Sequence, residues 1–301
     1  VSKNTSREKG VWKCLSPCSW SRHEQEAMGS SGSKPAKGKQ VLASKLATAE
    51  KTGILNLADQ DLKASSPVWD KLQTQGLVSK LKTLDISGNT LKYLPAEILS
   101  MMWMKVLHAS RCNIQRTFDM TTLGRLVTLS LDNNDLEANC LAQLPGQLQR
   151  LNLSSNHFVT IPHEGLSGLL NLTELNLANN RLTTTEGLGV LVSLIDLNLD
   201  NNDIPEVSED VALCTHLKHL SLKANKVSGK AQDGRQSIPA ILFTMTQLDE
   251  LVLSGNVMLN RTMVWAFEGI DVFVERRRRS RDRNLAGGAA EDGMNIFGDL
   301  L

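Results

Sequence analysis

One eleven-residue pattern recurs along most of this chain, and it constrains the fold more than any other feature. Each copy reads Leu-x-x-Leu-x-Leu-x-x-Asn-x-Leu, and other aliphatic residues replace some of the leucines. A single copy cannot bury its own apolar side chains, so the copies must stack on one another to form a core. The copies open at Leu81, Met104, Leu126, Leu148, Leu172, Leu194, Leu217 and Leu248. A degenerate copy precedes them at Leu55, Leu57 and Leu62, with Gln60 where asparagine is expected.

The pattern predicts an α/β fold, the leucine-rich-repeat solenoid. Each copy supplies one short strand, such as the segment from Leu175 to Leu177, with its leucines inward and Asn176 outward. Neighbouring strands stack in parallel about 4.8 Å apart and form the concave face of a curved array. The convex side consists of short helical or irregular returns. Helical caps are expected at both ends.

An asparagine follows each predicted strand, where the chain turns away from the sheet. An amide side chain both donates and accepts hydrogen bonds, so it can satisfy backbone groups that the turn would otherwise bury unpaired. These residues are Asn89, Asn134, Asn156, Asn180, Asn202, Asn225 and Asn256. In the second copy the position holds Cys112, beside Asn113, so we expect a weaker turn there.

The array extends from residue 41 to 259. We predict a capping helix from Val41 to Lys51 that ends at Gly53 and covers the open edge of the first repeat. The polar stretch Gly229–Ser237 falls within the longest step between copies and is predicted to form a loop.

A second cap is predicted at residues 260–283, and it ends in an arginine run, Arg276–Arg283. Three interpretations of this run stay open: a solvated helix end, contact with anionic lipid, or nuclear import and RNA contact. Residues 284–301 are predicted to be a disordered tail that could carry a docking peptide.

The amino-terminal part has a different composition. Residues 1–27 share no pattern with the repeats, and we interpret them as disordered or foreign to the native chain. Residues 28–40 form a basic Gly/Ser/Lys lead in which Met28-Gly29 and Ser33 match a myristoylation signal. Gly29 would carry the lipid if translation starts at Met28. The lysines expected to contact anionic lipid are Lys34, Lys37, Lys39 and Lys45. The alternative is a flexible lead or a vector remnant.

Composition limits the partners and the compartment. The formal net charge is +1, so no overall field favours nucleic acid. No apolar run is long enough to span a membrane. The five cysteines do not cluster at the flanks of the array, which favours a reducing cytoplasmic compartment. We therefore expect a cytoplasmic monomer, held at the inner leaflet if Gly29 is acylated.

Two flanking segments resemble a known family. Thr48–Leu57 before the repeats, and Phe267–Asp271 running into a basic tail, are similar to leucine-rich repeat-containing protein 57. The resemblance covers roughly Met28 to Arg283. It implies a small intracellular, non-enzymatic repeat protein that can associate with membranes. The Lys-rich lead, the loop before Pro239 and the acidic tail depart from that family.

We find no catalytic motif and expect neither an enzyme nor a cofactor. No Walker loop, Gly-x-Ser-x-Gly or His-Glu-x-x-His occurs in the sequence. The tightest metal candidate is Cys214-x-His216-x-x-His219. In repeat register these side chains are expected to diverge, so no zinc site is predicted.

The remaining candidate is the outward face of the strands, which we predict to bind a protein or a peptide. An acidic patch of Glu174, Asp196 and Asp200, next to His219 and Lys223, would suit a basic segment. The alternative is that these polar residues only keep the sheet soluble. The predicted contact residues are His108, Asp132, Arg150, Asn152, Glu174, Asn176, Asp196, Asn198, Asp200, His219 and Lys223. The sequence thus favours an interaction scaffold. A soluble regulatory or targeting subunit of an enzyme, such as a protein phosphatase, is the alternative.

Overall fold

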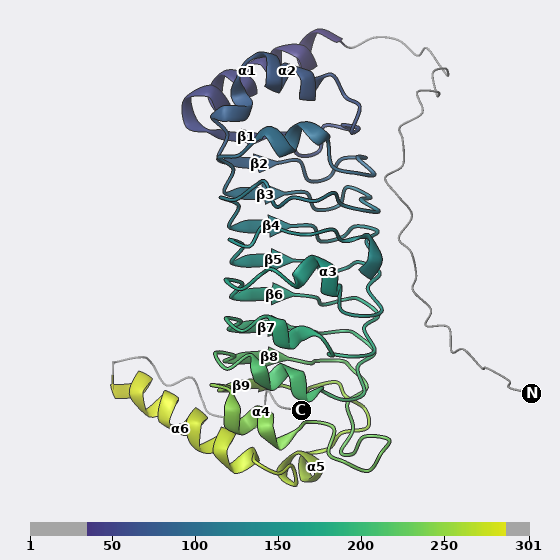
Figure 1. Ribbon diagram of the computed structural model, residues 1–301, viewed down its shortest axis with the longest axis vertical. Coiled ribbons are helices and arrows are strands. Elements are labelled where there is room, and N and C mark those ends of the chain that lie inside the picture. Colours follow the sequence, from purple (N-terminus) through teal and green to yellow (C-terminus); the bar gives the residue numbers. More distant parts are fainter. Residues whose placement is uncertain (1–34, 287–301) are drawn as a thin grey trace, which may run out of the picture. The chain divides into compact units, whose positions relative to one another are not determined.

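The computed structural model describes residues 35–286 and confirms the solenoid (Figure 1). The repeats lie within one compact unit, Val41–Leu301. Nine parallel strands form one sheet, and their order in the sheet is their order in the sequence. The strands are β1 (Ile54–Asn56), β2 (Thr83–Asp85), β3 (Val106–His108), β4 (Thr128–Ser130), β5 (Arg150–Asn152), β6 (Glu174–Asn176), β7 (Asp196–Asn198), β8 (His219–Ser221) and β9 (Glu250–Val252).

The strand register is the same at every step of the sheet. The middle leucine of each strand pairs with the middle leucine of the next, as Leu151 does with Leu175 and Leu175 with Leu197. These leucines are buried, and full burial of such a side chain contributes about 1.5–3 kcal/mol. Because side chains alternate along a strand, the residues on either side of each leucine point outward and form straight rows.

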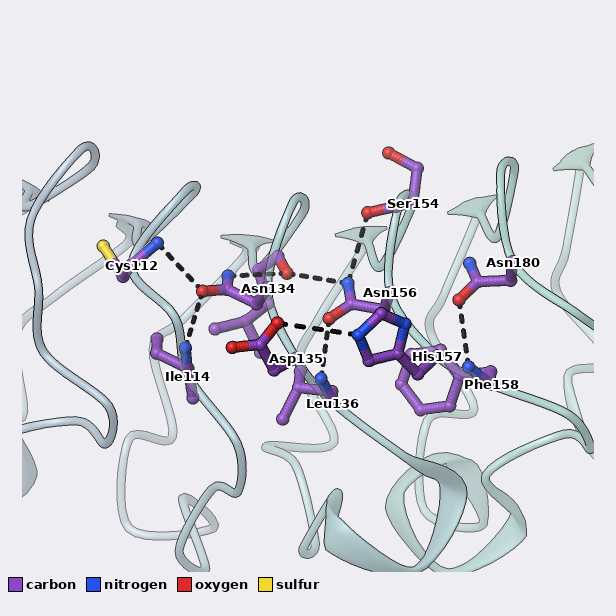
Figure 2. Close-up of polar contacts among 11 residues, drawn as sticks. Cys112, Ile114, Asn134, Asp135, Leu136, Ser154, Asn156, His157, Phe158 and Asn180 are labelled. Atoms are coloured by element: carbon purple, nitrogen blue, oxygen red, sulfur yellow. Dashed lines mark hydrogen bonds and ion pairs between the residues drawn. The ribbon is translucent and has the colours of Figure 1, made fainter.

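The turns of successive repeats share one geometry because of the asparagine ladder, which is the row of buried asparagines that follows the strands (Figure 2). The Asn134 Oδ1 accepts hydrogen bonds from the backbone N–H groups of Cys112 and Ile114, both at 3.0 Å. Its Nδ2 donates to the carbonyl oxygens of Ala109 at 2.9 Å and Leu131 at 2.8 Å. One amide therefore satisfies backbone groups of two successive repeats.

The second copy replaces this amide with the Cys112 thiol. The thiol donates to the Ile86 carbonyl at 3.1 Å, and burial raises the pKa of Cys112, so the thiol keeps its proton. The Leu91 N–H bonds to the backbone carbonyl of Cys112 at 3.0 Å, because no side-chain oxygen is available. The turn is thus closed by a different set of bonds. It has fewer side-chain contacts than the asparagine turns, and the weaker turn stays a prediction.

Most of the returns contain one short helix or 3-10 turn within otherwise irregular chain. Gly229–Ser237 is confirmed as a loop, in which Lys230 and Gln236 form an antiparallel bridge. The returns contain α2 (Val68–Thr74), η1 (Leu77–Ser79), η2 (Ala96–Ser100), η3 (Ala138–Cys140), α3 (His163–Leu166), η4 (Leu188–Val190), η5 (Glu209–Leu213) and α4 (Ala240–Met245).

Helices cap both ends of the array, and both begin or end outside the predicted bounds. The amino-terminal helix α1 (Pro35–Thr52) starts before Val41, within the segment interpreted as a lead, and stops where Gly53 takes a φ of 72°. Its Leu46 and Ala49 are buried in the core. At the other end, α5 (Arg261–Trp265) is followed by α6 (Ile270–Ala286), which runs through the arginine run. The first three residues of the predicted tail are therefore helical.

Candidate functional site

A groove follows the outward face of the sheet from β4 to β9. Its volume is about 560 Å³, and it is lined by the outward side chains of these six strands. Because the strands share one register, the lining residues fall into rows that cross the strands. Three rows matter here, and they differ in charge.

The first row lies at the start of the strands and is acidic. In order it holds Arg150, Glu174, Asp196, His219 and Glu250. The Arg150 Nη1 lies 3.9 Å from the Glu174 Oε1. The His219 Nδ1 contacts the Asp196 carboxylate. Three carboxylates against one arginine and one histidine leave this row with an excess of negative charge.

Sequence reasoning missed two acidic residues at the end of this row. The His219 Nε2 lies 3.6 Å from the Asp249 Oδ1, and Glu250 pairs with His219 in the strand register. Glu250 could have been found, because it occupies the same position in its repeat as Glu174 and Asp196. Asp249 could not, since its contact depends on the direction of the His219 ring.

Within the groove, the middle row is neutral and carries free amide donors. The Asn176 Oδ1 accepts from the Ala178 N–H at 3.0 Å, and the Asn198 Oδ1 accepts from the Asp200 N–H at 2.9 Å. Neither Nδ2 group has a hydrogen-bond partner among the described residues. Asn152 differs, because its Nδ2 donates to the Asp132 Oδ1 at 3.1 Å. His108 lies in the same row outside the groove, with its Nδ1 3.0 Å from the Ser130 Oγ.

The third row corrects the prediction of a single acidic patch. Asp200 lies four residues beyond Asp196, about 13 Å away along an extended strand, so it does not join Glu174 and Asp196. Its Oδ1 accepts from the Ser221 Oγ at 2.5 Å and from the Lys223 N–H at 2.9 Å. This carboxylate therefore holds neighbouring repeats together.

Asp132 also holds neighbouring repeats together, at an earlier position in the third row. Its Oδ1 accepts from the Ser110 Oγ at 2.6 Å, besides the bond from Asn152. The acidic groups that face the groove without such structural bonds are thus those of the first row.

The metal candidate does not assemble. Cys214 is buried, its Sγ lies 3.4 Å from the Leu188 carbonyl, and burial raises the pKa of its thiol to about 12. The His216 Nδ1 lies 3.2 Å from the Val192 carbonyl, while His219 faces the groove. Within residues 35–286, no group of three or more His, Cys, Asp or Glu side chains is arranged to hold a metal ion.

The arginine run is partly structural. The Arg276 Nη1 donates to the Leu248 carbonyl at 2.7 Å, and its Nη2 donates to the Phe243 carbonyl at 2.9 Å. Arg278 lies 3.9 Å from Glu275 and 4.0 Å from Asp282 on the same helix. Part of the charge of the run is therefore paired locally, and because α6 extends to Ala286 the run lies within the helix rather than at its end.

The described residues include only some of the predicted lipid contacts. Gly29 and Lys34 lie outside the described residues. Lys37 and Lys39 lie in the first turns of α1, and Lys45 is half-buried further along the same helix. None of the described helices is long and apolar enough to cross a membrane.

Comparisons with known proteins agree with the repeat pattern. Two family models described as leucine rich repeat match residues 146–204 and 80–102. A curated relative from Dictyostelium discoideum, Probable serine/threonine-protein kinase pats1, is 30% identical over 138 residues. That match covers 43% of this chain and 4% of the relative. The resemblance to leucine-rich repeat-containing protein 57 stays a prediction, because these matches are to the repeat in general.

Two solved structures share the fold. A leucine-rich-repeat protein of Leptospira interrogans is 23% identical, with a TM-score of 0.57, over 76% of this chain and 61% of that one. A chain from the octameric complex of Latrophilin 3, Unc5D and FLRT2 is 22% identical, with a TM-score of 0.51, over 72% of each chain. Repeat pattern, strand register and these matches together show that the chain contains leucine-rich repeats and folds as a leucine-rich-repeat solenoid.

Proposed function

We propose that this protein is a non-enzymatic interaction scaffold whose groove binds an extended protein segment with basic side chains. The acidic first row, from Glu174 to Glu250, is the observation that carries the proposal. The similar FLRT2 complex is an assembly of proteins by its title, which agrees with a role in protein binding. Repeat solenoids offer extended concave surfaces of this kind to their partners.

The dimensions of the groove set the length of the segment. Six strands at about 4.8 Å spacing span about 24 Å, which accommodates roughly seven extended residues. The free Nδ2 groups of Asn176 and Asn198 can donate to carbonyl oxygens of the bound main chain. Glu174 and Glu250 are exposed and can accept from lysine or arginine side chains. Charge at this row would set the orientation and the association rate of the partner.

A displayed heptapeptide library provides a direct test. The full chain is the bait, and we expect the selected peptides to be enriched in lysine and arginine. The affinity of one selected peptide is then measured by fluorescence anisotropy. The double substitution Glu174→Lys and Glu250→Lys should weaken binding at least about tenfold, because it replaces attraction with like-charge repulsion.

The matched control is Glu186→Lys with Glu206→Lys. These glutamates line a second hollow, next to the Gly229–Ser237 loop, and are equally exposed. This variant should bind the peptide as the native protein does. Selected peptides without basic residues, or equal losses in both double variants, would refute the proposal.

Membrane attachment through Gly29 is a separate proposal. It depends on translation from Met28 and on the basic lead, because one myristoyl chain alone binds membranes only marginally. It would place the scaffold on the cytoplasmic face of a membrane. Mass spectrometry of the amino-terminal peptide from native cells tests it, and an unacylated peptide that begins upstream of Met28 would exclude it.

A further inference from the structure

The flank where the chain enters the first strands carries unpaired basic residues. Lys82 and Lys105 occupy the same position in successive repeats, and the Lys105 N–H donates to the Lys82 carbonyl at 2.7 Å. Both side chains are exposed, and neither forms an ion pair with any described residue. Two positive charges therefore lie side by side on this flank with nothing to neutralise them.

An exposed apolar pair lies beside these lysines. The turn before β3 presents Met102, 60% exposed, and Trp103, 48% exposed. The Arg125 guanidinium from the next repeat lies 3.9 Å from the centre of the Trp103 ring. This cation–π contact holds a third positive charge against the aromatic side chain.

The acidic residues of these repeats lie elsewhere. Asp85 belongs to the middle outward row and accepts from Asn56 at 3.2 Å. Glu97 lies in the return turn η2, and Asp119 is bonded to Thr121. Glu50 pairs with Lys80 at 2.9 Å, so Lys80 adds little net charge. None of the carboxylates in the described residues forms an ion pair with Lys82, Lys105 or Arg125, so their positive charges are not neutralised locally.

The position that holds Trp103 and Arg125 in the early repeats holds small polar side chains in two later ones. There the side chains bond back to the preceding repeat: Asn171 donates to the Gly146 carbonyl at 2.9 Å, and Ser193 donates to the Leu170 carbonyl at 2.6 Å. Only the early repeats place a tryptophan and an arginine at these positions. The basic and aromatic character is thus local to the flank of β2, β3 and β4.

We propose that this basic flank, consisting of Lys82, Met102, Trp103, Lys105 and Arg125, binds an anionic lipid bilayer. Clustered basic side chains are attracted to the negative surface of the cytoplasmic leaflet. Tryptophan favours the headgroup level of a bilayer, and Met102 beside it adds apolar area that can enter the same layer. A protruding apolar turn bordered by cations suits a flat lipid surface better than an acidic protein, which would leave Met102 against charged groups.

This surface is separate from the groove and from the proposed lipid at Gly29. The test therefore uses the full chain produced without acylation, mixed with vesicles and sedimented. We expect binding to vesicles of phosphatidylserine and phosphatidylcholine, weakened by salt, and no binding to phosphatidylcholine alone. One basic residue near such a surface is worth roughly a fivefold gain, so Lys105→Glu, a change of two charges, should weaken binding about 25-fold.

Lys218→Glu is the matched control, because Lys218 is exposed at the same position of a later repeat and also bonds its neighbours only through the backbone. It should leave vesicle binding unchanged. For the apolar pair, Trp103→Ala should reduce binding, and Leu170→Ala, which removes a side chain that is 58% exposed on the later flank, should not.

Each other outcome overturns the proposal. Unchanged binding by Lys105→Glu would show that the basic lead alone contacts the vesicles. Binding to soluble polyglutamate but not to vesicles would indicate an acidic protein as the partner. Peptide binding in the groove should be normal in Lys105→Glu, which shows that the variant is folded and separates this test from that of the groove.

Discussion

At the scale of single residues, the asparagine ladder decides whether the turns can be buried. The Asn156 Oδ1 accepts from the Leu136 N–H, and its Nδ2 donates to the carbonyls of Leu131 and Leu153, all at 3.0 Å. Asn156→Ala leaves the buried Leu136 N–H unpaired and removes one hydrogen bond from each carbonyl, while Leu131 keeps its bond from Asn134 and Leu153 its bond from Asn180. The unpaired group costs about 1–3 kcal/mol and each lost bond about 1 kcal/mol, so the free energy of unfolding should fall by about 3 kcal/mol or more. Urea denaturation followed by circular dichroism measures the loss.

Asn171→Ala is the control in a neighbouring turn. Asn171 is exposed and makes one hydrogen bond, to the Gly146 carbonyl, which water can replace. Its loss should cost at most about 1 kcal/mol. Equal losses in the two variants would mean that the ladder has no special role in stability.

At the scale of elements, helix α6 closes the open end of the sheet, with Phe273 buried in the core and Arg276 bonded to the chain beneath it. The Arg276 guanidinium donates to the Phe243 carbonyl within α4 and to the Leu248 carbonyl between α4 and β9. Arg276→Leu removes both charge-assisted bonds and should destabilise the cap by about 2–3 kcal/mol. Hydrogen exchange should then accelerate in α6 and β9 more than in β5. Arg278→Leu, which loses only exposed ion pairs, should leave exchange nearly unchanged. Uniform acceleration along the whole chain would contradict this role.

At the scale of the whole molecule, the array has one continuous core. Leu153 is fully buried in the middle of it, so Leu153→Asp would place a carboxylate without a partner among leucines. We expect the Leu153→Asp variant to lose cooperative unfolding and most of the circular dichroism signal of folded structure. Val159→Asp, at a position of the same repeat that is 50% exposed, should have little effect. A folded Leu153→Asp protein would show that the two halves of the array are stable independently.

The repeat pattern predicted the whole molecule well because one physical requirement, stacking of apolar rows, fixes strand, register and turn together. It also placed Glu174, Asp196 and His219 in one row. The grouping of Asp200 with these residues failed, because residues that share an outward face need not share a row, and Asp200 bonds to the next repeat instead. It also missed the extent of α1 and α6, whose ends carry few of the apolar residues that mark a buried helix.

The longest step between copies, from Leu217 to Leu248, has a practical consequence. The additional residues form the Gly229–Ser237 loop, yet His219 still pairs with Glu250 in the common register. Length added on the return side is therefore absorbed without moving the strands. A fluorescent reporter or an affinity tag inserted at Gly234, in the tip of that loop, should leave ligand recognition intact and provide a handle for immobilising the protein with its binding face free.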